Sequence, residues 1–241
     1  NMLNTMLEAL KPVLEELSQG QSLMGILSNY ATDSLVTASC RIAFRYLSRQ
    51  KDQGREIAEK IALASQFAQA DPYRAATHNK GIFNGVDAIL IATGNDWRAI
   101  EAGAHAYASR DGRYQGLSSW RLDLETEELV GEMTLPMPVA TKGGSIGLNP
   151  RVALSHELLG NPSAKELAQL IVSIGLAQNF AALKALVSTG IQQGHMKLQA
   201  KSLALLAGAS ESEVAPLVER LIADKTFNLE TAQRYLENLR S

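Results

Sequence analysis

The sequence predicts an α+β fold in which helices pack on a small antiparallel sheet. Residues 2–18 place apolar side chains at spacings of one, three and four, which is typical of one face of an amphipathic helix. Residues 36–44 alternate apolar and polar side chains, as a strand with one buried face does. Two more alternating segments, 114–122 and 128–137, flank a polar turn and predict an antiparallel pair.

The first third of the chain predicts a helix, a strand and a second helix, which is part of a small α+β unit. The first helix ends near Gly20, the turn Asp52-Gln53-Gly54 follows the strand, and the second helix covers 55–69. The apolar positions are Met2, Met6, Leu7, Leu10, Leu14 and Leu17 in the first helix, Val36, Ala38, Cys40, Ile42 and Phe44 in the strand, and Ile57, Ile61, Leu63 and Phe67 in the second helix.

The middle of the chain predicts an alanine- and glycine-rich helix over 97–108, and then the antiparallel pair with its turn at 123–127. The glycine-rich run 140–147 favours a tight turn over a P-loop, because the order Gly-Lys-Ser/Thr is absent. The last third is helical, with one helix near 196–207. Its start and stop signals are Ser163 with Glu166, Gly208, Ser210 with Glu213, and Asn228.

Composition indicates an ordinary globular protein. The chain has 241 residues, enough for one large or two small domains, and a net charge of -2, which gives no sign of a nucleic-acid partner. A single cysteine, Cys40, excludes an internal disulfide and fits a reducing compartment. No run is expected to reach the roughly 18 apolar residues of a membrane helix, and no signal peptide is recognised. We therefore expect a cytoplasmic protein without a membrane partner.

The segment around Lys80 carries the chemistry. Gly81 and Gly85 predict turns at which backbone can approach another group closely. The apolar element 86–92 follows, and then Asp96 on a Gly-Asn turn. A lysine at an apolar element beside a carboxylate holds a cation next to a polarisable oxygen. The alternative is a surface lysine, with Asp96 capping the next helix.

Several motifs around this segment are specific. They are Ser28–Asp33, His78–Gly81, Asn84-Gly85, Ala92–Ala99, Glu101–Ala106 and Gly194–Met196. Together they resemble the 3-hydroxy-3-methylglutaryl-coenzyme A (HMG-CoA) reductases, most closely the bacterial class II form. The similarity runs through nearly the whole chain.

The resemblance implies a division into three parts. Residues 1–71 would be the remainder of a ferredoxin-like cofactor domain inserted in the larger substrate and dimerisation domain, 72–190, with Pro72 at the return point. Residues 191–241 would form a helical C-terminal flap. Asn1 would end the family's motif Asp-Ala-Met-Gly-x-Asn, so that the chain is a C-terminal portion and the catalytic glutamate lies upstream.

The resemblance also implies a reaction. NADPH or NADH would reduce HMG-CoA to mevalonate and coenzyme A through mevaldyl-CoA and mevaldehyde, in a homodimer whose active site lies at the subunit interface. No metal is implied. The catalytic residues would be Lys80, Asp96 and His195, the last on a mobile flap.

The same resemblance assigns binding residues. Arg74 and Asn84 would be substrate-binding residues. Arg74 would pair with the free carboxylate of the substrate, because a guanidinium matches a carboxylate in bidentate geometry. Asn84 would orient Lys80, because residues four apart share one face of a helix. Asn1 and Asn29 would bind the nicotinamide cofactor.

Other readings stay open at this point. The chain would be a non-catalytic fragment if the upstream glutamate is missing, or a lysine Schiff-base aldolase if Lys80 is unpaired with a lowered pKa. His78, His105 and His156 compete with His195 for any catalytic role, and either nicotinamide cofactor remains possible.

Overall fold

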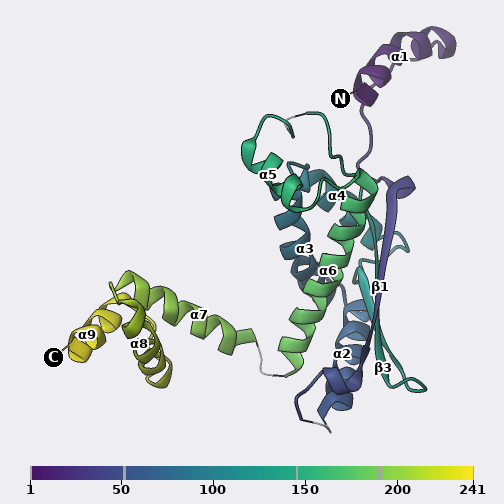
Figure 1. The fold of residues 1–241 in the computed structure, drawn as a ribbon. Coiled ribbons are helices and arrows are strands. Elements are labelled where there is room, and N and C mark those ends of the chain that lie inside the picture. Colours follow the sequence, from purple (N-terminus) through teal and green to yellow (C-terminus); the bar gives the residue numbers. More distant parts are fainter. Residues whose placement is uncertain (1, 51–52, 145, 189–190, 241) are drawn as a thin grey trace. The chain divides into compact units, whose positions relative to one another are not determined.

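The computed structural model describes residues 2–50, 53–144, 146–188 and 191–240, without the side chains of residues 191–195. The chain forms two compact units, Asn1–Phe180 and Ala181–Ser241. Figure 1 shows the elements of both units in chain order. The predicted division at residues 71 and 190 concerns the intact enzyme and stays a prediction.

The first unit is built on a three-stranded antiparallel sheet in the order β1-β3-β2. β1 is Leu35–Ala43, β2 is Ser118–Asp123 and β3 is Glu128–Pro136. The predicted strand over 36–44 and the predicted antiparallel pair are thereby confirmed. The pairing of β1 with β3 joins segments far apart in sequence, and it brings Cys40 opposite Gly131.

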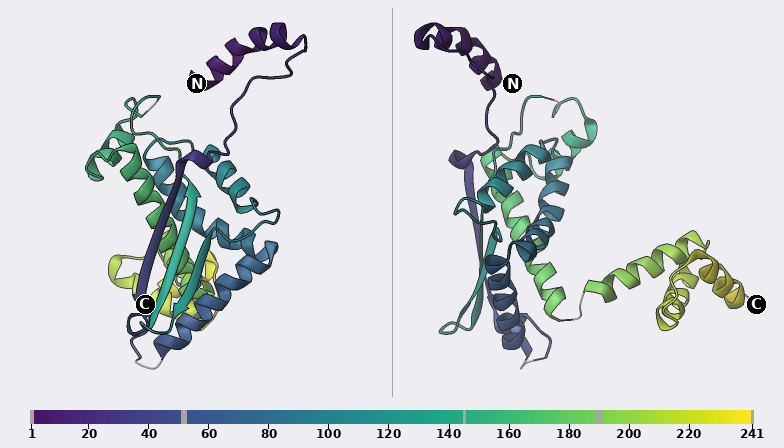
Figure 2. Two further views of the ribbon diagram at one scale, coloured as in Figure 1. Left: turned by 90° about the vertical axis from the view of Figure 1, so that its right-hand side faces the viewer. Right: turned by 180° about the vertical axis from the view of Figure 1, so that it is seen from behind.

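Helices cover one face of this sheet, and the other face is open (Figure 2, left). They are α2 (Gln53–Ala70), α3 (Pro72–Ala92), α4 (Trp97–Ala108) and the part of α6 (Ala164–Val187) up to Phe180. In β1 the inward residues are partly buried and the alternate ones, such as Thr37 and Arg41, are exposed. This is the pattern that the period of two predicts.

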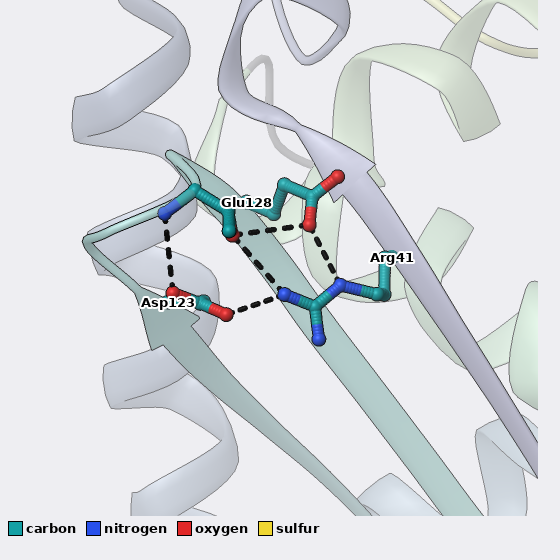
Figure 3. A network of polar contacts seen from close by, with 4 residues as sticks. Arg41, Asp123 and Glu128 are labelled. Atoms are coloured by element: carbon teal, nitrogen blue, oxygen red, sulfur yellow. Dashed lines mark hydrogen bonds and ion pairs between the residues drawn. The ribbon is translucent and has the colours of Figure 1, made fainter.

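On the open face, Arg41 ties β1 to the end of the β2–β3 hairpin (Figure 3). Its guanidinium contacts Asp123 and donates through Nε to Glu128 over 2.7 Å. Arg41 and its partner carboxylates are partly solvent-exposed. Because water screens exposed ion pairs, we expect this network to contribute little to stability and to fix the register of the strands.

Trp120 anchors α6 to the sheet. Its indole lies over Gly131, its cross-strand neighbour, where any Cβ atom would collide with the ring. The indole Nε1 donates to Asn179 Oδ1 on α6 over 2.7 Å, and the ring centroid lies 5.4 Å from that of Phe180. The sheet and α6 therefore meet through one aromatic residue with both an apolar and a polar contact.

α3 is one continuous helix, so the expectation of turns at Gly81 and Gly85 is wrong, and the apolar element 86–92 is its last two turns. Asp71 caps its start, where Tyr73 N donates to Asp71 Oδ1 over 2.9 Å. Gly85 instead lies at a tight contact between helices, because a Cβ there would stand 3.1 Å from Gln178 Cβ on α6. Glycine here permits helix–helix approach, and does not mark a break.

α6 also corrects the expectation that no segment resembles a membrane helix. Its 24 residues have a mean hydropathy of 1.7 in the best window, enough by length and composition to cross a membrane. Within the first unit, however, Leu167, Ile171 and Val172 are buried in the core. These contacts are those of a core helix. Ser163 and Glu166 form its predicted capping box, with Ser163 N donating to Glu166 over 2.8 Å.

The remaining elements of the first unit are short or peripheral. α1 (Met2–Ser18) matches the predicted first helix, has no buried residue and contacts the segment after it, where Leu27 N donates to Asn4 over 3.0 Å. The 3₁₀ turns η1 (Thr32–Ser34) and η2 (Phe44–Tyr46) flank β1, and α5 (Pro150–Leu158) follows the glycine-rich loop. That loop contains Gly143 and Gly144 at positive φ, in keeping with a tight turn.

The second unit is a small helical bundle of α7 (Ile191–Leu206), α8 (Glu211–Ala223) and α9 (Leu229–Arg240). Ser210 and Glu213 form the predicted capping box, and Asn228 accepts from Thr231 N over 2.8 Å. Its buried core consists of Ala200, Ala204, Leu217, Val218, Leu221, Ala232 and Leu236.

Candidate active site

α3 divides its side chains between two faces. One face is buried and consists of Ala75, His78, Asn79, Ile82, Phe83, Val86 and Leu90. The opposite face is exposed and carries Lys80 and Asn84, with the half-buried Arg74 at its border. Lys80 and Asn84 are four residues apart, which places them on adjacent turns of the same face. The buried face thus fixes the helix in the core, and the exposed face presents a cation and an amide to solvent.

Lys80 is exposed, and no described carboxylate lies within 4.0 Å of its ammonium group. Lys80 stands on the same helix as the apolar run 86–92, without a carboxylate beside it among the described residues. Its catalytic role stays a prediction.

Asp96 is the N-cap of α4, where its Oδ1 accepts from Ala99 N over 3.2 Å. It also lies 3.8 Å from Arg98 Nε. The alternative that Asp96 caps the next helix is thus confirmed. Among the described residues, no ion pair joins Asp96 to Lys80. Its catalytic role stays a prediction.

Arg74 has an unusual environment for a guanidinium. Burial lowers its pKa from the ordinary value, and no described carboxylate lies within 4.0 Å of it. A half-buried cation without an internal counter-ion favours binding of an external anion.

The histidines have different surroundings. His105 Nδ1 lies 2.8 Å from the hydroxyl of Tyr114, and the buried His156 bonds the carbonyl of Thr93 through Nε2 over 3.1 Å. His78 and His156 are buried and do not face solvent as free proton donors, whereas His105 is partly exposed. His195 belongs to α7, but its side chain lies outside the described residues, so its predicted role stays a prediction.

His78 belongs to a buried polar network that the sequence did not reveal. Its Nε2 lies 2.7 Å from Ser118 Oγ on β2, and Ser118 donates to Asn179 Oδ1 on α6 over 2.8 Å. Burial, and then the charge of Arg74, lower the pKa of His78 to about 4, so the ring is neutral near pH 7. The sequence signal that could have revealed this network is the position of His78, which falls at helical spacing with the apolar residues of α3.

Asn29, a predicted cofactor residue, lies in the segment before η1. Its carbonyl oxygen would stand 2.5 Å from a Cβ at Gly103, so glycine allows this segment to lie against α4. The side chain of Asn29 is exposed and makes no hydrogen bond with a described residue. Asn1, the other predicted cofactor residue, lies outside the described residues.

A family model described as hydroxymethylglutaryl-coenzyme A reductase matches residues 1–200 of the chain. The chain belongs to the HMG-CoA reductase family. Among curated relatives, the reductase of Archaeoglobus fulgidus is 45% identical over 241 residues, covering 100% of this chain and 54% of the relative. A probable reductase of Borreliella burgdorferi is 36% identical over 203 residues, or 84% of this chain and 47% of the relative. The chain therefore spans about half the length of its curated relatives in the HMG-CoA reductase family.

Solved structures of the HMG-CoA reductase family agree. A reductase from Streptococcus pneumoniae matches with 96% identity and a TM-score of 0.77, over 99% of this chain and 57% of that chain. A class II reductase from the same organism, described as bound to NADPH in open conformations, matches with 96% identity and a TM-score of 0.76, over 100% of this chain and 58% of that chain. The mixed α and β elements of this chain are therefore those of HMG-CoA reductase structures.

Proposed function

We propose that this chain is the part of an HMG-CoA reductase that supplies the cationic face of the active site. In this role the enzyme reduces HMG-CoA to mevalonate and coenzyme A with NADPH or NADH. The observation that carries the proposal is α3, whose exposed side holds Lys80 and Asn84 beside the half-buried Arg74. Family membership supports a common substrate for these three residues.

Lys80 stabilises the negative charge that develops on the substrate carbonyl oxygen. Hydride addition to a carbonyl builds charge on that oxygen, and a fixed cation lowers the barrier more than a mobile one. Lys80 stands on a helix whose opposite face is buried, so its backbone is held in place before the substrate arrives. Asn84, one turn further along, orients the ammonium group.

Arg74 binds the free carboxylate of the HMG group. Its guanidinium is half-buried, and no described carboxylate of the protein occupies it. A planar guanidinium matches a carboxylate in bidentate geometry, which fixes the orientation of the substrate as well as its affinity.

His195 and Asp96 complete the proposed catalytic set. Coenzyme A departs as a thiolate, and a histidine titrating near neutrality is suited to protonate it. Asp96 approaches Lys80 in the assembled, substrate-bound enzyme and favours its charged form.

The nicotinamide cofactor supplies the hydride when bound. The exposed amide of Asn29 makes no bond with a described residue, and its backbone is held against α4 at Gly103, so its donor and acceptor groups fit a cofactor amide or hydroxyl. We assign Asn1 to the same site through the family motif alone.

The family also supports the assembly and location that we propose. The enzyme is a cytoplasmic homodimer with its active site at the subunit interface, built from a ferredoxin-like cofactor domain, a substrate domain and a helical flap. Sedimentation of the intact enzyme tests the assembly, and a stable, active monomer would contradict it.

The activity test measures cofactor oxidation that depends on HMG-CoA in the intact enzyme. We expect two cofactor molecules oxidised for each mevalonate formed, and NADPH and NADH are compared directly. No oxidation above background would favour the non-catalytic alternative. Trapping of Lys80 by borohydride with a carbonyl ligand would instead favour a Schiff-base aldolase.

A further inference from the structure

The buried face of α3 holds two neighbouring polar residues that bond to one segment of chain, residues 115–118. Asn79 donates to the carbonyl of Gln115 over 2.9 Å and accepts from Leu117 N over 2.8 Å. His78 bonds Ser118 over 2.7 Å. Apolar contacts tolerate small rotations of a helix, but hydrogen bonds are directional and weaken steeply when misaligned. These bonds therefore define the rotation of α3 about its axis.

The hydrogens of the network can be assigned from its acceptors. Asn179 Oδ1 cannot donate, so Ser118 gives its single hydroxyl proton to Asn179 over 2.8 Å. Ser118 can then accept from His78 Nε2, which also lies 3.2 Å from the amide nitrogen of Asn179, a group that only donates. Trp120 Nε1 also donates to Asn179 Oδ1 over 2.7 Å. The chain of hydrogen bonds runs from α3 through β2 to α6.

A hydrolytic role for the His78–Ser118 pair does not fit. Ser118 and His78 are each 2% exposed, so the hydroxyl cannot meet a substrate. His78 Nδ1 is buried without a hydrogen-bond partner, whereas an activating histidine needs an orienting acceptor there. The pair therefore has a structural role, and it can affect function only by changing the position of α3.

Lys80 stands on the far side of α3 from this network. Residues two apart in an α-helix project about 200° from each other and differ in height by about 3 Å. With side chains about 5–6 Å from the axis, a rotation of about 10° moves a side-chain tip by roughly 1 Å. A misplacement of about 1 Å can lower a rate about 100-fold.

We propose that His78 is a positioning residue for Lys80, acting through Ser118 and Asn179 to fix the rotation of α3 against β2 and α6. This inference rests on the proposed reductase function. It assigns to the buried histidine neither contact with substrate nor proton transfer.

The test compares two amides at position 78 in the intact enzyme. The side-chain amide of His78→Gln reaches the place of Nε2 and donates to Ser118, whereas that of His78→Asn reaches only the place of Nδ1. We expect His78→Asn to lose roughly 10- to 100-fold in kcat on both HMG-CoA and mevaldehyde, and His78→Gln to recover most of it. The KM for NADPH should stay unchanged in both variants, because α3 carries no proposed cofactor residue.

Two further variants keep the test decisive. Ser118→Ala removes the acceptor with a small change of volume, and it should lower kcat in the same direction even if His78→Asn does not fold. Ser173→Ala removes an exposed hydroxyl that bonds the carbonyl of Gln169 within α6, and it should leave kcat unchanged. Free energies of unfolding are measured for all variants.

Equal losses in kcat for His78→Asn and His78→Gln, in proportion to lost stability, would overturn the proposal. So would unchanged kcat in a folded Ser118→Ala variant. Lack of HMG-CoA reduction by the unaltered enzyme would contradict the proposed function instead, so the two failures are distinguishable.

Discussion

The carboxyl group of Asp87 on α3 faces that of Glu101 on α4, and the two share a hydrogen bond that requires one proton. Burial, then the charge of Glu101 and this bond, raise the pKa of Asp87 to about 7. Its Oδ1 atom is buried without a hydrogen-bond partner. The contact between α3 and α4 therefore gains or loses a proton near neutral pH.

This pair makes stability fall as pH rises. The folded pKa of Asp87 lies above its ordinary value of 3.8, so between about pH 4 and pH 7 the folded chain holds a proton that the unfolded chain has released. The free energy of unfolding should decrease through that window. The side-chain amide of Asp87→Asn can still donate a hydrogen bond to Glu101 but does not titrate, so the free energy of unfolding should decrease less with pH in this variant. Urea unfolding at about pH 5 and about pH 8 measures this change in the free energy of unfolding. Glu219→Gln on α8 is the control. An equal change in Asp87→Asn, or a smaller change in Glu219→Gln, would contradict the prediction.

Lys80→Ala should abolish reduction of both HMG-CoA and mevaldehyde by the intact enzyme, because each hydride transfer needs the oxyanion stabilised. Loss of such a stabiliser costs about 100-fold or more in kcat. Stability should not change, since Lys80 is exposed and has no described ion pair. Lys60→Ala, at an exposed lysine paired with Glu56 on α2, is the control. Near-normal turnover of either substrate by Lys80→Ala would remove the assignment.

His195→Gln should separate the two halves of the reaction. It should cripple the reduction of HMG-CoA and leave that of free mevaldehyde comparatively intact, because no thiolate departs from mevaldehyde. General acid catalysis is worth roughly 100- to 10,000-fold, so the two rates should part clearly when assayed across pH. Equal losses on both substrates would mean that His195 is structural or serves both steps.

Gly131→Ala should destabilise the sheet. Any Cβ at this position collides with the indole of Trp120, and overpacking of this kind costs about 1–3 kcal/mol. Denaturant unfolding, monitored by fluorescence of Trp120, measures the change. An unchanged midpoint would show that the indole moves aside at no cost.

Gly81→Ala should have the opposite effect on stability. A Cβ at Gly81 would meet nothing within 4 Å, and alanine in a helix interior is favoured by about 0.5–1 kcal/mol. We expect a more stable chain with lower activity, because the remaining reason for glycine beside Lys80 is close approach of substrate or of another subunit. A more stable variant with full activity would exclude that reason.

Local patterns predicted most of the elements, because helical and strand periods and capping boxes are properties of neighbouring residues. The first helix, β1, the hairpin and both capping boxes followed from them. The glycines of α3 misled, since Gly85 serves contact with Gln178, a residue far along the chain. The His78–Ser118–Asn179 network was missed for the same reason. Its partners are 40 and 61 residues apart, and no local period specifies them.

The two faces of α3 have a consequence for evolution. Substitutions on the exposed side, at Lys80 or Asn84, should alter chemistry without a folding penalty, whereas those at His78 or Asn79 would affect folding and chemistry together. Selection on Lys80 therefore acts through chemistry alone, whereas selection on the buried pair acts through folding as well. Laboratory libraries aimed at altered specificity should keep Lys80 and the buried pair and randomise Asn84 and other exposed positions of α3.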